Sequence, residues 1–390
     1  MGTISKSREL SYDEIQAFGA ELDALRKETI AKLGKEDADY IYKIRNFVRY
    51  SEIGSRAALM TMGWLPPVWL AATATLGISK IVENMELGHN VMHGQYDWMN
   101  EPSLRGSSFE WDTVCTADNW RHTHNYMHHT YTNVREVDHD IGYGVLRIFP
   151  EQKWEPRFLL NPIMAGVLAV TFEWTLSLQS LELEKLQTGE KTWADVRKQL
   201  PPMFAKMRKQ FAKDYLFFPL IAGPNFLPVI TGNIVANVIR NFWTFSIIFC
   251  GHFTEDAETF DKSVLENETR GHWYLRQLRG SSNIAGGKVF NILSGNLSHQ
   301  IEHHMFPDVP GMRYEEMSVK VKEICARYGQ HYNTGSFTKQ FSTVVGRIFK
   351  YALPFGQKVQ ATADTAIARL AEVVPVSTPS RRKVREAVAA

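Results

Sequence analysis

Three groups of closely spaced histidines constrain this 390-residue chain more than any other feature of its sequence. They comprise His89 and His93, then His124, His128 and His129, then His299, His303 and His304, with His252 between the second and third groups. Residues four apart on a helix share one face, so the members of each such pair can point at one centre. Nine imidazoles are enough for two metal ions and too many for one, which predicts a di-metal site.

The ligand type narrows the choice of metal. Imidazole suits zinc, copper, iron and nickel, and a structural zinc ion needs only four ligands. Cys115, Cys250 and Cys325 lie far apart and form no CxxC pair, which argues against a zinc ribbon, an iron–sulfur cluster or a disulfide framework. Two metals bound almost wholly by histidine beside apolar segments favour iron and the activation of O₂.

Other polar residues near these groups are expected to support the metal site rather than to bind the metals. His122 would face away from His124 on a helix, and we expect His139 to support the site rather than bind metal. Histidines that bind a metal usually donate their second N–H to a carboxylate or carbonyl. The nearby carboxylates that could accept this bond are Glu86, Asp138, Asp140 and Glu302.

The apolar residues are concentrated in three zones, about 57–87, 158–181 and 215–251. Pro66-Pro67 interrupts the first zone, which predicts either two imperfect helices or a single membrane crossing. Pro224-Asn225, Pro228 and Gly232-Asn233 interrupt the last zone, which predicts a helical hairpin of roughly 215–231 and 234–251. The predicted organisation is an N-terminal cytosolic helical region (1–55), a membrane domain (56–350) and a basic C-terminal tail (351–390).

The charge of the loops and the number of membrane crossings between the histidine groups constrain the topology. Residues 182–214 carry eight lysines and arginines, so this loop is predicted to be cytosolic. If the second and third histidine groups share one site, an even number of crossings separates them, and the last hairpin supplies two. We therefore expect 158–181 to lie along the membrane surface or to re-enter it. The sequence predicts an all-α integral membrane protein of the cytoplasmic membrane, with its site on the cytosolic side.

Two further segments have two open interpretations each. Residues 11–35 form an amphipathic pattern with a capping box at Ser11 and Glu14, which fits a solvated helix or a membrane-surface helix. Arg240 lies in the last apolar zone near Asn237 and Asn241, about 18 Å along a helix from His252. An ionisable residue in such a segment suggests a function, although packing explains it equally well. The net charge of +2 gives no reason to expect nucleic acid as a partner.

The order HxxxH, HxxxHH and (H/Q)xxHH resembles that of the membrane fatty acid desaturases. Longer strings are similar to the bacterial acyl-CoA Δ9 desaturases of the mycobacterial type, and the resemblance covers roughly residues 40–350. These strings are ENMELGHNVMHGQ (83–95), HHTYTN (128–133), DIGYG (140–144), WYLRQ (273–277) and HQIEHHMFPD (299–308).

This resemblance implies a mushroom-shaped helical fold, with about four transmembrane helices and a cytosolic cap that holds two irons. It assigns ligand roles to His89, His93, His124, His128, His129, His303 and His304, and His252 matches an additional histidine of the family. The third group offers both His299 and Gln300 as its first ligand. Some relatives have Asn four residues before the additional histidine, where this chain has Ile248.

The implied reaction is O₂-dependent formation of a cis double bond in a long saturated acyl chain, as an acyl-CoA or an acyl lipid. The sequence contains no GxGxxG after a predicted strand, so a separate NAD(P)H-dependent reductase of the ferredoxin or flavin type is expected to supply electrons. The basic residues of 182–214 could receive this donor or the CoA phosphates, although membrane topology explains them better. The alternatives are a fatty acyl or alkane hydroxylase, a membrane zinc hydrolase and a metal transporter.

Overall fold

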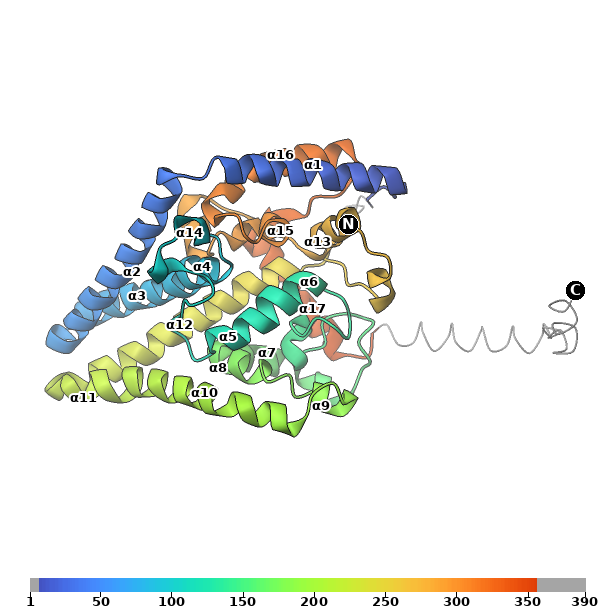
Figure 1. Ribbon diagram of the computed structural model, residues 1–390. Helices are drawn as coiled ribbons and strands as arrows, with labels where there is room; N and C mark the ends of the chain where they lie inside the picture. The colour runs from blue at the N-terminus through green and yellow to red at the C-terminus, as the bar shows by residue number, and fades with distance from the viewer. Residues whose placement is uncertain (1–6, 356–390) are drawn as a thin grey trace, which may run out of the picture.

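The computed structural model describes residues 7–355, and this part of the chain is almost entirely helical (Figure 1). The α-helices are α1 (Tyr12–Ala31), α2 (Lys35–Met62), α3 (Pro66–Val82), α4 (Asn90–Met92), α5 (Ala117–Trp120), α6 (His129–Tyr131), α7 (Asn161–Val170), α8 (Phe172–Gln179), α9 (Lys185–Thr188), α10 (Trp193–Phe211), α11 (Phe218–Ile221), α12 (Phe226–His252), α13 (Arg270–Gly280), α14 (Lys288–Leu293), α15 (Gln300–Met305), α16 (Tyr314–Arg327) and α17 (Phe337–Ala352). Three π-helical segments are η1 (Glu83–His89), η4 (Arg121–His128) and η7 (Ala212–Phe217). The described strands, β1 (Asn283–Ala285) and β2 (Thr334–Ser336), pair in parallel. The predicted helical class is confirmed, and nearly all of the predicted basic tail lies outside the described residues.

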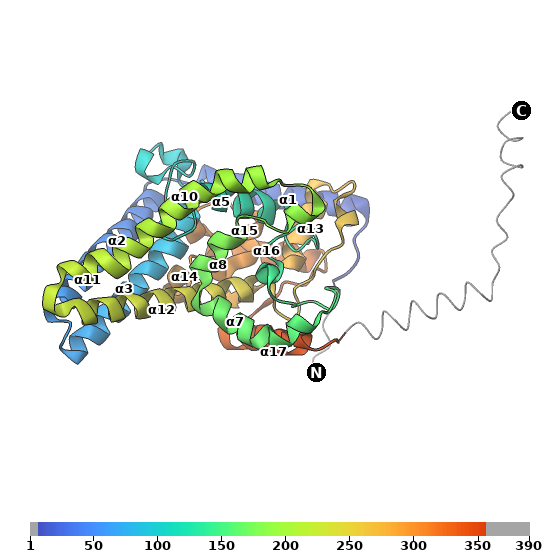
Figure 2. The same ribbon diagram turned by 90° about the horizontal axis from the view of Figure 1, so that it is seen from below.

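Four helices, α2, α3, α11 and α12, converge at one end of the molecule to form what we call the stem (Figures 1 and 2). Helix α2 contacts α3, and both contact α12. The predicted break at Pro66-Pro67 is confirmed, because these prolines occupy the first turn of α3, where a missing N–H costs nothing. Helix α2 begins at Lys35, well before the apolar zone, so its length does not follow from hydrophobicity alone.

The predicted hairpin turn at Gly232-Asn233 is wrong. Helix α12 runs without a break through both residues, and the turn lies at Gly223–Asn225, where Gly223 has a φ of +55°. A Cβ at Gly232 would lie 3.0 Å from Leu59 and 3.1 Å from Thr73. Gly232 therefore allows α12 to approach α2 and α3 closely, which is a packing role that a single sequence cannot distinguish from a turn.

A buried carboxylate links the stem helices. Asp214, in η7, pairs with Arg56 of α2 at 2.9 Å and with Lys80 of α3 at 2.7 Å. Asn237 of α12 donates to the same carboxylate at 3.2 Å. Because all of these groups are buried, losing the shared carboxylate would leave buried positive charge uncompensated, so the network fixes how the helices pack.

One helical stretch of the described residues, Gly223–His252, is long and apolar enough to cross a membrane. The segment predicted to lie along or re-enter the membrane forms a bent pair, in which Pro156–Val170 and Phe172–Gln179 meet at 100°. A straight crossing by this segment is therefore absent. A bent pair of this kind is either a broken crossing or a re-entrant segment, so the predicted path of 158–181 and the number of about four crossings stay predictions.

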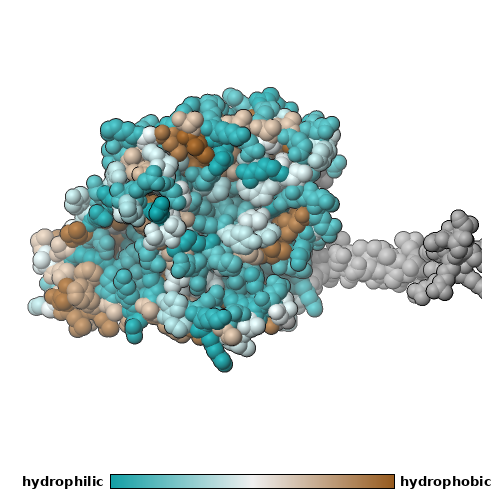
Figure 3. Space-filling model, viewed as in Figure 1, coloured by the Kyte–Doolittle hydropathy of each residue, from teal (hydrophilic) through white to brown (hydrophobic). Residues whose placement is uncertain are grey.

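The end of the stem exposes large apolar side chains. Figure 3 shows them as a hydrophobic patch at the lower left, away from the more hydrophilic remainder of this face. They include Met62, Trp64 and Leu65 between α2 and α3, and Phe217, Leu220, Ile221 and Leu227 around α11. An apolar patch of this kind marks a surface that contacts a membrane or another protein.

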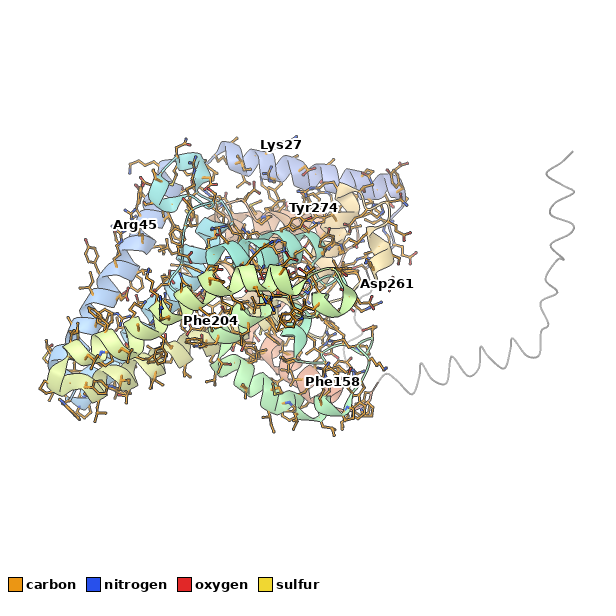
Figure 4. The ribbon with its side chains drawn as sticks, turned by 60° about the horizontal axis from the view of Figure 1, so that its bottom comes forward. Lys27, Arg45, Phe158, Phe204, Asp261 and Tyr274 are labelled. Atoms are coloured by element: carbon orange, nitrogen blue, oxygen red, sulfur yellow. The ribbon has the colours of Figure 1, made fainter. Side chains whose placement is uncertain are left out.

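The opposite part of the molecule, which we call the cap, packs α1, α13, α15 and α16 together (Figure 1). The predicted capping box of α1 is present, with Ser11 and Glu14 bonded reciprocally. The apolar face of α1 is buried, since Phe18 and Leu22 are fully enclosed within the cap core. Tyr274 of α13 lies beneath α1 and donates to Asp23 at 2.8 Å (Figure 4). Helix α1 is thus a structural part of the cap.

Candidate metal centre

Two π-helical segments carry the first two histidine groups. His89 ends η1, whereas His124 and His128 belong to η4. Each segment continues into a short α-helix: His93 directly follows α4, and His129 begins α6. The His89 and His93 rings lie 4.7 Å apart, and the His124 and His128 rings lie 5.2 Å apart. The predicted neighbouring pairs are therefore present. Single π-turns are rare and occur often at functional sites.

Seven histidines form two buried or half-buried groups in which the ligand nitrogens lie within 4.8 Å of one another. The first group contains His89, His93, His124 and His303, and the second contains His128, His252 and His304. Asp140 forms a third set with His124 and His128. The consecutive residues His303 and His304 thus face different groups, as the rotation of about 100° per helical residue requires.

His129 lies between the two groups. Its ring stacks on that of His304 at 4.3 Å and lies 4.6 Å from His93. Both of its ring nitrogens are buried without a hydrogen-bond partner. His129 therefore lies next to residues of both groups without belonging to either.

His299 and Gln300 have different positions. The backbone of His299 is not α-helical (φ −106°, ψ 55°), so His299 and His303 do not share a continuous helical face. His299 belongs to neither group and lies 4.0 Å from Glu302. The side-chain amide nitrogen of Gln300 lies 2.9 Å from His252 Nε2. The structure therefore brings Gln300, and not His299, to the centre.

The outer nitrogens of several rings are held by hydrogen bonds. His128 Nδ1 lies 3.0 Å from Asp138, which also accepts a bond from the Asn133 backbone N–H at 2.7 Å. His304 Nδ1 lies 3.1 Å from Gln277 Oε1, and His89 Nδ1 lies 3.0 Å from Asn90 Oδ1. These bonds favour the tautomer in which Nδ1 carries the proton, which leaves Nε2 free to bind a metal.

Of the four predicted supporting carboxylates, two reach the histidines. Asp138 contacts His128, and Asp140 lies 3.6 Å from His124 Nδ1. Glu86 instead accepts bonds from Tyr40 and Asn296, and Glu302 accepts bonds from Asn283 and Tyr332. Glu86 and Glu302 thus bond side chains from other segments of the chain. His122 and His139 lie outside both groups, near Glu182.

Burial keeps most of these imidazoles neutral. It lowers the pKa of His89 to about 3, with a further contribution from neighbouring His124. Burial and adjacent rings also lower the pKa of His93, His129 and His303 well below the ordinary value. His128 is the exception, because Asp138 and Asp140 outweigh its burial and raise its pKa to about 9. Neutral rings are the form that binds a metal.

The donor set fits metal ions. The Nε2 atoms of His89, His93, His124, His129 and His303 are all buried and without a hydrogen-bond partner. Buried polar atoms are rarely left unsatisfied, so several at one place indicate a missing partner. His252 Nε2 lies 3.3 Å from His128 Nε2 and 3.0 Å from His304 Nε2, which converge on a second position. A metal at each position would satisfy these atoms.

A cavity extends from the first histidine group. His89, His124 and Trp120 line it near the centre, and Trp120 stacks on His124 with ring centroids 4.5 Å apart. Its other lining residues are Asn84, Met85, Trp111, Thr113, Thr123, Asp140, Tyr143, Phe172, Glu173, Leu176, Arg240, Asn241, Thr244, Ile248 and Leu297. Of these lining residues, the sequence pointed to Arg240 and Ile248 as positions of interest. It gave no sign that Trp120 or Glu173 lies near the centre, since nothing in their spacing connects them with the histidines.

The comparisons with known proteins agree on one family. Residues 63–336 match the family model described as fatty acid desaturase. The NADPH-dependent stearoyl-CoA 9-desaturase of Mycobacterium tuberculosis is 42% identical over 349 residues, which cover 88% of this chain and 82% of that relative. The sn-1 linoleoyl-lipid 6-desaturase of Synechocystis is 28% identical and covers 68% of this chain and 75% of its own length. The family match spans every histidine of the two groups.

Proposed function

Because the chain belongs to the fatty acid desaturase family, we propose that it introduces a cis double bond at the Δ9 position of a long saturated acyl-CoA, with O₂ as co-substrate. It is an oxidoreductase by its family. The observation that carries the proposal is the cavity, whose lining includes His89 and His124 as well as a series of apolar and aromatic side chains. A methylene chain in this cavity would lie against the metal-binding group.

Two irons are the proposed metals. His89, His93, His124 and His303 would hold one, and His128, His252 and His304 the other, with His129 between them and Gln300 beside His252. When bound, the irons would supply the activation of O₂ and the removal of hydrogen from the acyl chain. The protein would supply the ligand tautomers, through Asp138, Gln277 and Asn90.

The remaining task of the protein is to position the chain. Phe172, Tyr143 and Leu176 form apolar walls of the cavity, and burial of methylene groups against them would supply binding energy. Reacting atoms misplaced by about 1 Å can cost ~10²-fold in rate, so rigid walls select which carbons react. The same walls exclude water from the reacting carbons.

The head group, the position of the double bond and the electron donor are proposed from the names of the relatives. The acyl-CoA head group and the Δ9 position rest on the relative whose name gives stearoyl-CoA and position 9. Acyl-lipid substrates are the second candidate, because another relative is named as a lipid desaturase. The name of the first relative also gives NADPH dependence, which supports a separate NAD(P)H-dependent reductase of the ferredoxin or flavin type as the electron donor.

Gas chromatography–mass spectrometry of fatty acids would test the reaction. Cells would express the chain with an active electron donor, beside a His303→Ala, His304→Ala variant and a His331→Ala control. The doubly substituted variant should make no new monounsaturated acids, whereas wild type and the control should, with the double bond at C9 after derivatisation. Hydroxy acids would instead establish the hydroxylase reaction. No new product, with iron bound and the donor active, would contradict an acyl substrate.

A further inference from the structure

The cavity that His89 and His124 line is also lined by a charged pair. Arg240 of α12 and Glu173 of α8 both line it, and the Arg240 guanidinium forms an ion pair with the Glu173 carboxylate. Arg240 is 2% exposed and Glu173 is 9% exposed. Charged groups are rarely buried to this extent unless they are paired. Their place in a cavity with largely apolar walls therefore needs an explanation beyond helix packing.

Neighbouring polar groups hold Arg240 in place. Arg240 Nε donates to Asn241 Oδ1 at 3.0 Å, and its Nη2 donates to Asn237 Oδ1 at 3.4 Å. The Asn241 amide donates in turn to the backbone carbonyl of Val170 at 2.8 Å. Val170 is the last residue of α7, directly before the 100° bend that places Glu173 on the next helix. The bend and α12 thus fix the pair from two sides.

The pair lies far from the histidines along the axis of α12. Arg240 precedes His252 by twelve residues, which corresponds to about 18 Å along a helix. Thr244 and Ile248 line the cavity between these levels, about 12 Å and 6 Å from His252. The part of an acyl chain beyond the reacting carbons would occupy this stretch, with its methyl end toward Arg240.

The methyl end of an acyl chain cannot pass the Arg240–Glu173 pair without a large cost in free energy. To advance, the chain would have to separate two buried opposite charges or displace their hydrogen-bond partners, and either change leaves a charge uncompensated in an apolar environment. Methylene groups offer no compensating hydrogen bond. An apolar wall of equal size could move aside by a rotamer change, whereas the bonded pair is held by Asn237 and Asn241.

We propose that the Arg240–Glu173 ion pair is the floor of the acyl cavity and sets the longest chain that this enzyme desaturates. The pair acts as a specificity determinant, and it touches neither metal position. This inference rests on the proposed function, because it takes the cavity to be the acyl site.

The test measures chain-length preference with pair-wise substitutions. A single substitution would leave one buried charge unpaired, so the informative variant is Arg240→Ala, Glu173→Ala, which removes both charges and opens the floor. Membranes that contain wild type or variant would receive a series of saturated acyl-CoA substrates of increasing length with an active electron donor. The ratio of product from chains longer than the wild-type limit to product from stearoyl-CoA should rise by more than about 10-fold, since each methylene in an apolar pocket changes selectivity at least that much.

A second variant tests whether narrowing the cavity between the pair and the histidines favours shorter chains. Thr244→Leu places a larger side chain between the floor and the histidines, and it should shift the preference toward shorter chains. The matched control is Arg56→Met, which removes a buried arginine of the stem that lies outside the cavity and leaves Asp214 paired with Lys80. This control should keep the wild-type preference.

The outcomes separate the two proposals. If wild type makes no unsaturated product, the proposed function fails before the floor is tested. If wild type is active and both cavity variants keep its chain-length preference, the floor proposal is overturned. If the double variant does not fold, as judged by its iron content and thermal unfolding, an unchanged preference of Thr244→Leu overturns the proposal and a shift to shorter chains supports it.

Discussion

At the scale of single residues, hydrogen bonds to the outer ring nitrogens orient the histidines of the candidate centre. His128, His304 and His89 each place Nδ1 on a side-chain oxygen, of Asp138, Gln277 and Asn90 respectively, and thereby leave Nε2 for a metal. These acceptors come from distant parts of the chain as well as from adjacent residues. Two residue-scale predictions follow from such side-chain contacts.

The first concerns the third histidine group. Gln300 lies 2.9 Å from His252 Nε2, whereas His299 lies in neither group. Gln300→Ala should therefore reduce metal affinity by about 10–100-fold, the usual cost of removing a residue that supports metal ligands. His299→Ala should leave metal affinity close to that of wild type. Metal titration of the two purified variants would measure this difference, and the reverse order would make His299 the ligand.

The second concerns the pH dependence of stability. Burial raises the pKa of Glu86 to about 8, against the lowering effect of its bonds to Tyr40 and Asn296. An unfolded glutamate has a pKa of about 4.3, so the folded state binds a proton that the unfolded state releases. This group stabilises the fold fully below about pH 4.3, and the contribution is lost as pH rises toward 8.

Glu86→Gln removes this titration while keeping a neutral side chain of the same size. Between pH 5 and pH 8, the melting temperature of wild type should fall relative to that of Glu86→Gln. Thermal unfolding of both proteins at a series of pH values would measure this change. Parallel curves over the whole range would show that Glu86 does not titrate there.

At the scale of elements, π-helical turns and close helix contacts position the residues of the site. η1 and η4 carry three of the histidines, and η7 carries Asp214, which joins α2, α3 and α12. Helix α12 brings His252 to the centre at one end and passes Arg240 on the way. Its approach to the other stem helices depends on Gly232.

Two helical glycines offer a matched test of this packing. A Cβ at Gly232 would meet Leu59 at 3.0 Å, whereas a Cβ at Gly166 of α7 would meet nothing within 4 Å. Gly166→Ala should raise the free energy of unfolding by up to about 1 kcal/mol through helix propensity. Gly232→Ala should lower it, since overpacking costs about 1–3 kcal/mol. Chemical denaturation in detergent would measure both, and an equal gain in the two variants would contradict a packing role for Gly232.

At the scale of the whole molecule, an apolar stem end lies opposite a polar cap, with the histidines at the inner ends of α3 and α12. The basic residues of α10 and the loop before it predict that the cap faces the cytosol. The three cysteines of the chain are buried in this arrangement. Single introduced cysteines can therefore report which side of the membrane each part occupies.

Asp118 on α5, next to the histidine-bearing segment η4, and Trp64 at the stem end are both exposed. A membrane-impermeant maleimide should label Asp118→Cys in inverted vesicles and leave it unlabelled in intact cells. Trp64→Cys should show the opposite pattern if the stem crosses the bilayer. Labelling of both positions from the cytosolic side would show that the stem end stays on the cytosolic side of the membrane.

The sequence by itself determined the parts that depend on local spacing. A separation of four residues places His89 beside His93 and His124 beside His128, because helical geometry fixes which neighbours share a face. The capping box at Ser11 and the start of α3 at Pro66 are equally local, and both are confirmed. The family also follows from the sequence, since its histidine pattern and longer strings extend over most of the chain.

Only the tertiary structure decided the features that depend on contacts between distant segments. The tertiary structure decided which histidines join His303 (His89, His93 and His124) and which join His304 (His128 and His252). Gln300 reaches His252 because the backbone leaves the helix at His299. The single sequence did not indicate that Gly232 packs against Leu59 or that Arg240 pairs with Glu173. Spacing along the chain fixes only local neighbours, whereas these contacts arise when separate helices pack together.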